Sequence, residues 1–584
     1  MSDFAILETL TADEWQANDR NSGQAICHYG SIQRTWSSTT SNSKLEYVSM
    51  QLTMSTKLKE KASAFRHALT SRVAMVHYLE APLLPGDDIN SESRRWTNRD
   101  LALSPPQDRK WNQWTFLAFW VAHAAGAGGW TTGSSLIAVG LEPLSAWLAI
   151  ASSHILITFL IVLNGRASSR YHIGFPVLAR SSFGMWGSYM AIAMRAIVCI
   201  IWNGTNSYYG GKCVTVAITA IWPQFGRLPN TLPASAGITT KDFTSFWIFM
   251  AVFIAISFVH SRDLRWFYVG KSIFVFVAMH SILIWYLVTA GGVSITTLAN
   301  SDPPTGSAYV WLVLRVFNSG LGNASSLTVN QGDMTRYAKK PSDALWTTLI
   351  SYPIASALPA LYGILVAACA KKLTGTAFWS VWDVLGFMLE QYPNNHGARF
   401  GIFLCATALA LAFLAVSGYG YWLAPIAAIM SIDYYIVKKG NINTRDIFVG
   451  NSSSRYWFVR GVNPRAVATV LISLVPCLPS FAAQIAPNHL NMTSTGVNFF
   501  YISFTFTWTL AALLYYLSYV VFPEKGEIVV EKSLRREQWA DDLEREEMAA
   551  LILGVMEEAT VLPKHSSDGT RDDEKVEVAK LANA

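Results

Sequence analysis

The stretch WNQWTFLAFWVAHAAGAGGWTTGSSLIAVG, residues 111–140, carries two features on which the fold depends. It is an apolar run long enough to cross a hydrocarbon core of ~30 Å as a helix. It is also interrupted near its middle by AAGAGGW, residues 124–130. A helix that is broken at mid-membrane frees backbone carbonyl and amide groups, which can then bind an ion or a solute. The stretch therefore predicts a membrane span whose break forms part of a binding site.

A second glycine-rich stretch, NSGLGNASS at residues 318–326, interrupts an apolar run that lies five runs further along the chain. Two breaks at this separation are typical of transporters built from a five-plus-five inverted repeat. Small residues also let two helices pack closely in lipid, and that interpretation needs no break. Because the two stretches occupy matching positions, we favour broken helices in both.

Further apolar runs predict a polytopic, all-α membrane protein. Hydrophobic residues make up 51% of the chain, charged residues only 14%, and the mean hydropathy is +0.27. A soluble chain of this length does not combine such values. We expect a polar cytoplasmic region at 1–110, a transmembrane domain at 111–522 and a charged cytoplasmic tail at 523–584. Spans are expected at 112–139, 144–163, 189–221, 243–260, 268–290, 308–329, 346–370, 400–436, 466–485 and 498–522.

Basic residues show the orientation of these spans. Arg and Lys gather before the first span and after the second, fourth and sixth spans, whereas the loops 291–307 and 486–497 contain neither. By the positive-inside rule, both termini are cytoplasmic. The same rule requires the long run 400–436 to cross an odd number of times, so we expect one bent crossing there and ten crossings in all.

Span three contains a candidate solute-binding face. Trp202 and Asn206 are four residues apart and so lie on one side of a helix. An indole can stack on a flat heterocycle while an amide binds its hydrogen-bonding edge. In the glycine-rich stretches we expect Gly126, Trp130 and Asn323 to take part in the same site. For Asn323 the reason is that a side-chain amide without a partner is costly at mid-membrane. An interfacial Trp and an interhelical Asn would explain Trp202 and Asn206 equally well without further context.

Several other classes of protein are disfavoured. The chain has no Walker loop, and His123, His172, His260 and His280 lack metal-ligand spacing, so we interpret them as structural or interfacial. Its six cysteines show no paired spacing. The net charge of +6 comes from bases in short loops, which does not indicate nucleic acid. We therefore expect neither an enzyme nor a bound cofactor.

The stretch YHIGFPVLARSSFG, residues 171–184, is similar to the first nucleobase–cation symporter family, in particular its fungal uracil/allantoin permease branch. Matching motifs recur at 220–223, at Asn330 with Asp333, at 336–339 and at 433–435. The resemblance implies a leucine-transporter-type fold of twelve spans, with a five-plus-five inverted repeat and coupling to Na⁺ or H⁺. It also implies that Trp202 stacks on the solute and that carbonyls near Ala122 and Ala125 help to hold the cation.

The chain departs from this family at three places. Asn206 stands where the family usually has Gln, and Ala324, another candidate solute contact, stands near a usual aromatic residue. The third departure is a gap, because the family's Thr-Asn…Ala-Asn and Pro-Trp-Asn motifs do not follow residues 399–403. Residues 414–416 run almost directly into 421–425, which resemble the tenth span. The missing segment would supply hydroxyl ligands to the cation and an Asn to the solute.

Together these features predict a plasma-membrane cation symporter for a nucleobase-like heterocycle such as uracil, allantoin or a related purine or pyrimidine. Thiamine or a pyridine nucleoside is an alternative solute, since relatives for those solutes resemble this chain in having Asn in span three. Because of the gap, a non-transporting degenerate relative, or a gene model that has lost an exon, is a rival explanation.

We expect the lipid bilayer and a small heterocyclic solute as partners. A surface helix is expected at 531–560. Lys564, Lys575 and Lys580 in the tail could be ubiquitinated, which would make a ubiquitin ligase or endocytic adaptors further partners.

Overall fold

The computed structural model describes most of the chain from residue 96 onward. The described ranges are 96–98, 100–124, 126–257, 265–292, 305–413, 422–485, 498–523 and 534–561, with isolated positions between 63 and 75 and at 493 and 496. The chain divides into two units, Met1–Pro82 and Leu83–Ala584. All that follows concerns the second unit, which contains both the spans and the tail helix.

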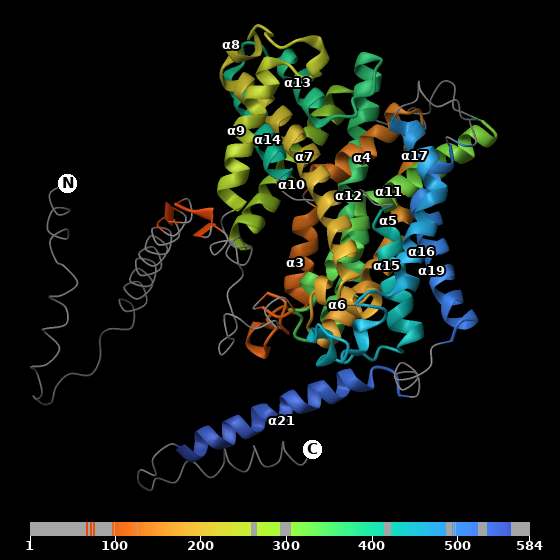
Figure 1. The fold of residues 1–584 in the computed structure, drawn as a ribbon. Coiled ribbons are helices and arrows are strands. Elements are labelled where there is room, and N and C mark those ends of the chain that lie inside the picture. Colours follow the sequence, from red (N-terminus) through yellow and green to blue (C-terminus); the bar gives the residue numbers. More distant parts are fainter. Residues whose placement is uncertain are drawn as a thin grey trace, which may run out of the picture. The chain divides into compact units, whose positions relative to one another are not determined.

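The described part of this unit is helical and has no named strand, as Figure 1 shows. The helices that correspond to the first seven predicted spans are α3 (Gln113–Ala124) with α4 (Ala127–Ala138), α5 (Pro143–Tyr171), α7 (Ser188–Ile221), α9 (Thr240–Ser257), α10 (Arg265–Thr289), α11 (Ser307–Thr335) and α12 (Pro341–Thr374). The later ones are α14 (His396–Ala412), α15 (Ala424–Ile432) with a π-helical turn at Asp433–Val437, α16 (Pro464–Leu474), α17 (Leu478–Ile485) and α19 (Ser503–Val521). Short helices α6 (Phe175–Phe183), α8 (Pro223–Gly226) and α13 (Val381–Gln391) lie between spans, and α21 (Gln538–Val561) follows the last span.

The break in span one is confirmed. Helix α3 ends at Ala124 and α4 begins at Ala127, with Gly126 in an extended conformation between them. Both halves pack against α12, and α5 packs against both α11 and α12. We call α3, α4, α5, α11 and α12 the bundle. Span one therefore packs against span seven, and span six packs against span two. A five-plus-five repeat makes spans one and two correspond to spans six and seven, so it requires these two matching pairs.

The predicted break in span six is wrong, because α11 runs without interruption from Ser307 to Thr335. The glycines there serve close packing instead. A Cβ on Gly320 would lie 2.0 Å from the Ser153 hydroxyl and 3.0 Å from the Ser153 Cβ of α5, so a larger residue there would require Ser153 or the two helices to shift. The close-packing interpretation of small residues therefore holds for span six.

The run 400–436 forms two short helices rather than one long one. Helix α14 packs against α7 and α10, whereas α15 packs against α19 and α16. Figure 1 shows α14 in the upper half of the domain and α15 in the lower half; residues 414–421, which connect them, lie outside the described residues, so the single bent crossing stays a prediction. The glycines at which we expected the kink, Gly418 and Gly420, lie outside the described residues.

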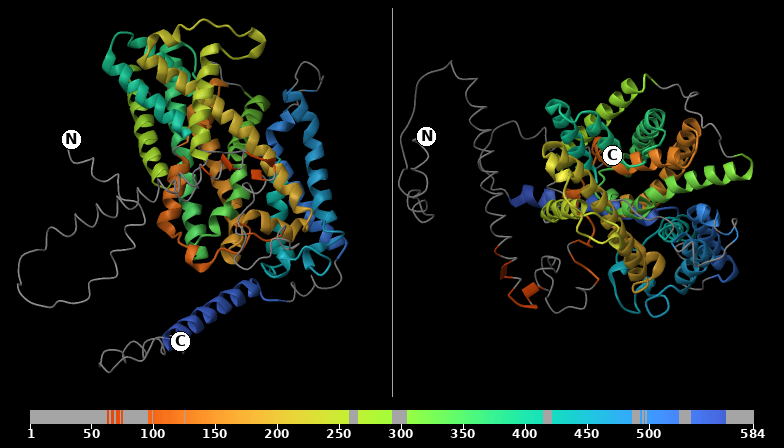
Figure 2. Two further views of the ribbon diagram at one scale, coloured as in Figure 1. Left: turned by 60° about the vertical axis from the view of Figure 1, so that its left-hand side comes forward. Right: turned by 90° about the horizontal axis from the view of Figure 1, so that it is seen from above.

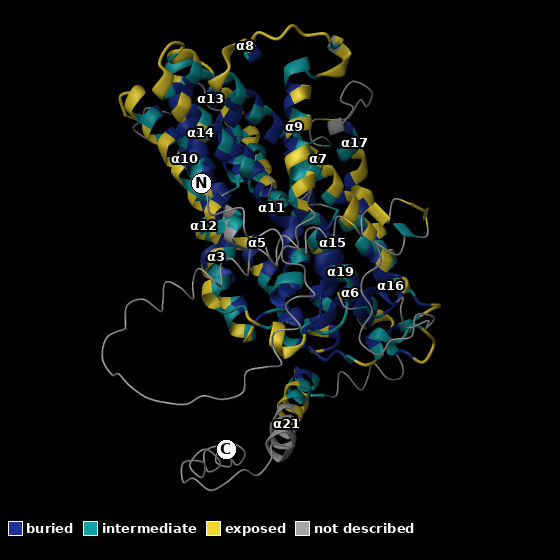
Figure 3. Ribbon diagram, turned by 90° about the vertical axis from the view of Figure 1, so that its left-hand side faces the viewer, coloured by how far each residue is buried: buried dark blue, intermediate teal, exposed yellow. Residues whose placement is uncertain are grey.

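Many large apolar side chains of the long helices are exposed, and Figure 3 shows exposed residues along the outer sides of these helices. On α10, Ile273, Val277, Ile284 and Val288 are all more than half exposed and lie on one face. A stripe of this kind suits contact with lipid rather than water. The chain has seven helices that are long and apolar enough to cross a membrane among the described residues, and α14 and α15 are shorter apolar helices.

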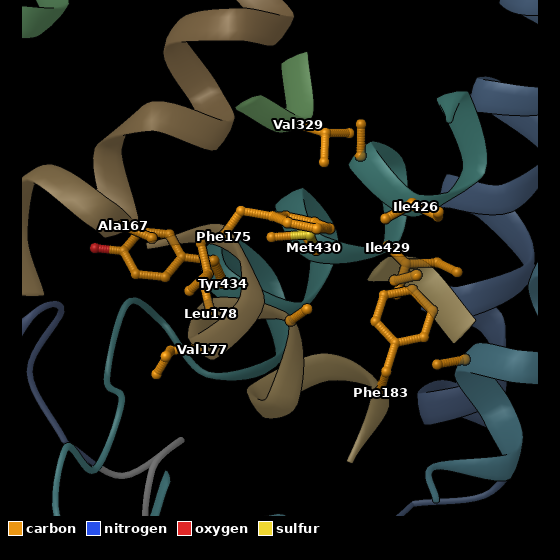
Figure 4. Close-up of a cluster of buried hydrophobic side chains, with 14 of the residues drawn as sticks. Ala167, Phe175, Val177, Leu178, Phe183, Val329, Ile426, Ile429, Met430 and Tyr434 are labelled. Carbon is orange, nitrogen blue, oxygen red and sulfur yellow. The ribbon is translucent and has the colours of Figure 1, made fainter. Parts of the chain in front are cut away.

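The main buried cluster joins α6 to α15 and the last spans. Phe175, Leu178 and Phe183 of α6 face Ile426 and Met430 of α15 in Figure 4. Figure 2 shows α16, α17 and α19 standing to one side of the bundle. The short helix α6, which connects span two to span three, therefore packs in one buried cluster with α15 and the last spans.

The tail helix α21, which confirms the expected surface helix, is held to the membrane domain by ion pairs. Arg109, before span one, donates to both oxygens of Glu547 at 2.6 and 2.8 Å. Arg166 and Arg170, at the end of α5, bind Glu537, Asp541 and Glu544. The segments that precede span one, follow span two and form the tail thus lie on one face of the domain.

Candidate functional site

A cavity lies at the break in span one. Its walls come from the bundle, from α7 and from the end of α14, and the space that the centre of a water molecule can occupy is about 50 Å³. That space holds several waters. The lining residues are His123, Gly126, Gly128, Gly129, His154, Asn206, Asn323, Tyr352, Ser356, Pro359, Ala412 and Phe413.

Three of the predicted solute-binding residues line this cavity. Gly126 stands at the break itself, Asn206 comes from α7 and Asn323 from α11. The Asn206 side chain is buried, and its amide nitrogen has no hydrogen-bond partner within the described residues. Asn323 donates to the Thr132 hydroxyl at 3.4 Å, a long bond that leaves its amide oxygen available.

The other predicted residues do not line it. Trp202, one turn before Asn206, packs against the buried cluster of α6, α15 and the last spans. Trp130 is fully buried in a cluster with α10 and α12, and Ala324 is buried near Trp120. Ala122 belongs to α3 and is absent from the lining, while Ala125 lies outside the described residues.

Sequence reasoning missed four residues with aromatic rings in the cavity, of which Phe413 comes from the end of α14. His123 of α3, His154 of α5 and Tyr352 of α12 gather there, with the Tyr352 ring centroid 6.1 Å from His123 and 6.0 Å from His154. Behind them, the Trp120 indole donates to the Thr348 hydroxyl at 2.9 Å. A histidine inside an apolar run is a functional candidate by its position alone, and this signal was available at His154.

The cavity offers few oxygen-bearing side chains as ligands for a metal cation. Among its lining residues, oxygen-bearing side chains come from Asn206, Asn323, Tyr352 and Ser356, and there is no carboxylate. Helix α14, which corresponds to the span expected to provide hydroxyl ligands, contributes Ala412 and Phe413 instead. The described residues also contain no group of three or more His, Cys, Asp or Glu that could hold a metal ion. This donor set does not fit a Na⁺ site with hydroxyl ligands from α14.

A protein family described as "Permease for cytosine/purines, uracil, thiamine, allantoin" matches residues 104–417 and 404–521. Together the two segments cover well over half of the chain. They meet within and just after α14, next to the junction with α15.

Individual relatives and solved structures agree with this match. An uncharacterised permease of Schizosaccharomyces pombe is 30% identical over 65% of this chain and 73% of its own length. The uracil permease of Saccharomyces cerevisiae is 26% identical over 79% of this chain and 83% of its own length. The inward-facing structure of Mhp1 superposes with a TM-score of 0.55 at 16% identity, over 75% of this chain and 98% of Mhp1. At that identity the likeness shows the fold, which is the expected leucine-transporter type.

Proposed function

Since this chain belongs to the family of permeases for cytosine/purines, uracil, thiamine and allantoin, we propose that it is a cation symporter for a nucleobase-like heterocycle such as uracil, allantoin or a related purine or pyrimidine. The family and its relatives are membrane transporters, not enzymes. The proposal adds the solute class, the location in the plasma membrane and the cytoplasmic position of both termini.

The observation that carries the solute class is the unpaired amide of Asn206 in the cavity at the break of span one. A buried amide without a partner is unfavourable by about 1–3 kcal/mol, and a bound solute that accepts from it removes this penalty. Nucleobases carry carbonyl and N–H groups on one edge, which match the carboxamides of Asn206 and Asn323. The rings of Tyr352 and Phe413 provide flat apolar surface in the same cavity.

Uptake of radiolabelled uracil in a yeast host without nucleobase permeases tests this proposal, with allantoin and thiamine as competitors. Asn206→Ala should weaken the affinity for uracil by about 3- to 10-fold, as expected for one hydrogen bond. Asn206→Gln, which adds one methylene, should shift preference toward uracil or allantoin. Asn164→Ala is the matched control, because the Asn164 amide bonds to Leu160 O within its own helix at 3.3 Å. Equal competition profiles for wild type and Asn206→Gln would contradict a role of Asn206 in solute recognition.

Thiamine or a pyridine nucleoside is the alternative solute. The family description includes thiamine, and the shorter Asn206 side chain leaves more room than Gln would. Stronger competition by thiamine than by allantoin in the uptake assay would favour this alternative.

A non-transporting relative is the second alternative, and the observation that favours it is the composite crossing α14–α15. The family match falls into two segments that meet there, and α14 brings only Ala412 and Phe413 to the cavity. Sequencing the transcript across codons 416–420 separates the two explanations. A transcript that contains the family's missing segment at this point would support the symporter. A transcript that reads directly from codon 416 to codon 420 as given, together with absent uptake, would support a degenerate protein.

For the tail we propose that Lys564, Lys575 and Lys580 are sites for ubiquitin and that endocytic adaptors bind there. These residues lie outside the described part of the structure. Replacing all three with Arg should slow removal of the protein from the plasma membrane.

A further inference from the structure

Three lysines lie beside the starts of α3 and α12. Lys110 precedes α3, and Lys339 and Lys340 precede α12. All three are exposed, and the part of the chain that the structure describes offers their ammonium groups neither an ion pair nor a hydrogen bond. One exposed lysine is ordinary on any protein surface. Three that lie together indicate a partner with negative charge.

Backbone contacts bring these lysines together from two distant parts of the sequence. Trp111 and Ala338 form a parallel bridge, and the backbone N–H of Lys339 donates to Trp111 O at 2.9 Å. The Trp111 ring packs in one buried cluster with Ala338. Side chains alternate between the two sides of extended backbone, so Lys110 and Lys339 lie on the opposite, exposed side. Lys340 follows directly, and we call these three residues the lysine group.

Neighbouring bases on the same face are used within the chain. Arg109 donates to both carboxylate oxygens of Glu547 in the tail helix. Arg336 donates to one hydroxyl and two backbone carbonyls of the segment before α3. The acidic residues nearest to the lysine group in the sequence, Asp108 and Asp343, are both described and form no ion pair with it. The lysine group is therefore available to a partner outside the chain, whereas the two arginines are not.

Two exposed tryptophans indicate the level of the membrane surface at this place. Trp114 lies in the first turn of α3 and Trp346 in the second turn of α12, and they are 68% and 65% exposed. The two helices pack against each other. Tryptophan is enriched at the level of the lipid headgroups, where its ring meets apolar chains and its N–H meets water. The lysine group precedes both helices and so lies on the water side of that level.

A lipid headgroup with negative charge fits this arrangement. Lysine binds phosphate as a point charge, and the cytoplasmic leaflet carries the anionic phospholipids. We propose that Lys110, Lys339 and Lys340 bind the headgroup of an anionic phospholipid of that leaflet. The inference goes beyond the transported solute and rests only on the proposed cytoplasmic position of both termini, which places the starts of α3 and α12 on the cytoplasmic side.

The lipid site lies on the half-helix that leads to the cavity. Helix α3 has 12 residues, so it is about 18 Å long, and His123 in its last turn lines the cavity. A headgroup bound to Lys110 and Lys339 together would hold the start of α3 against the start of α12. The lipid composition of the leaflet would thus act on a helix that forms part of the cavity wall.

Lipid binding by the purified full chain in detergent tests the site. Fluorescent phosphatidylserine and phosphatidylcholine with the same acyl chains are the probes, and phosphatidylserine should bind more tightly to wild type. Lys339→Gln/Lys340→Gln should weaken phosphatidylserine binding about 25-fold, and Lys110→Gln about 5-fold, because each base near an anionic headgroup contributes a factor of about 5. Binding of phosphatidylcholine should stay unchanged in both variants.

Two control variants separate a specific site from general attraction between charges. Arg445→Gln/Arg460→Gln removes the same charge from two exposed residues between α15 and α16, and it should change the affinity for phosphatidylserine by less than about twofold, because salt screens charges outside the site. Lys339→Arg/Lys340→Arg keeps the charge and should bind phosphatidylserine at least as tightly as wild type. Size-exclusion profiles and thermal unfolding would show that each variant is folded.

Two outcomes would overturn the lipid site. One is equal affinity of wild type for phosphatidylserine and phosphatidylcholine. The other is an equal loss of phosphatidylserine binding in Lys339→Gln/Lys340→Gln and in Arg445→Gln/Arg460→Gln. No solute enters this assay, so its failure leaves the proposed transport function untouched, and a failed uptake assay leaves the lipid site untouched.

Discussion

Glu537 precedes the tail helix α21 and binds two elements of the membrane domain at once. Its carboxylate accepts two hydrogen bonds of 2.6 Å from Arg166 of α5 and one of 3.0 Å from the Tyr434 hydroxyl after α15. Its own backbone N–H donates to Lys439 O at 3.0 Å. Only 9% of the Glu537 side chain is exposed. We therefore predict that Glu537→Ala releases the start of α21 from the membrane domain.

The size of the effect follows from these contacts. A hydrogen bond to a charged group contributes about 1.5–3 kcal/mol, but the Arg166 side chain is 36% exposed and regains water when it loses its partner. We expect docking of α21 to weaken by about 2 kcal/mol, which corresponds to about 30-fold faster amide hydrogen exchange in that helix. Glu546→Ala is the matched control, because its ion pair with Arg445 lies at the surface. The charged groups are 3.7 Å apart, and the Glu546 and Arg445 side chains are 67% and 86% exposed. That variant should exchange like wild type.

The pH dependence provides an independent check. Burial opposes the ionisation of Glu537, yet the hydrogen bond and charge of Arg166, with those of Tyr434 and Arg170, hold its pKa below the ordinary 4.5. A carboxylate with a lowered pKa stabilises the docked state fully above its unfolded pKa and loses that contribution as the pH falls through the folded value. Protection of α21 should thus fall below pH 4.5 in wild type and fall less in Glu537→Ala, which keeps the ion pairs of Glu547, Asp541 and Glu544. Unchanged exchange in Glu537→Ala, or an equal rise in Glu546→Ala, would refute this account of how the tail is held.

Three further predictions concern the solute, the helix packing and the orientation. The sequence predicts that the Trp202 indole stacks on the solute, so a loss of ~1–3 kcal/mol in solute affinity in Trp202→Ala would support that role, whereas unchanged affinity in uptake assays would agree with the position of Trp202 outside the cavity lining. Gly320→Ala should lower the unfolding temperature, because the new Cβ would lie 2.0 Å from the Ser153 hydroxyl, whereas Gly322→Ala meets nothing within 4 Å and should not. A tag placed after Ala584 should be inaccessible to antibody on intact cells, since basic residues cluster in alternate loops; surface labelling would contradict the even number of crossings.

The sequence predicted the spans well because apolar run length is a direct consequence of bilayer thickness. It also predicted the break in span one, where α3 ends at Ala124 and α4 begins at Ala127. It failed in span six because a glycine can serve a break or a close contact, and only the neighbouring helix distinguishes the two. At Gly320 that neighbour is Ser153 of α5, which is remote in the sequence.

The cavity could be predicted only in part for the same reason. Asn206, Asn323 and Gly126 stood out as polar or flexible positions within apolar runs, and all three line the cavity. His123 lacks metal-ligand spacing, and the local sequence of His154 marks it only by its place in an apolar run. Their proximity depends on the packing of α3 against α12 and of α12 against α5, which local sequence does not encode.

The position of the cavity has a consequence for transport. Most of its lining comes from the bundle, while Asn206 belongs to α7 and Ala412 and Phe413 belong to the end of α14. Helices α7 and α14 pack against each other, so they form a wall that is separate from the bundle. A movement of the bundle relative to this wall would separate Asn206 from Asn323, and would carry His123 and His154 away from Asn206 together. Solute contacts would then change across the moving interface. Solute binding across this interface would therefore depend on the position of the bundle relative to the wall, as alternating access requires.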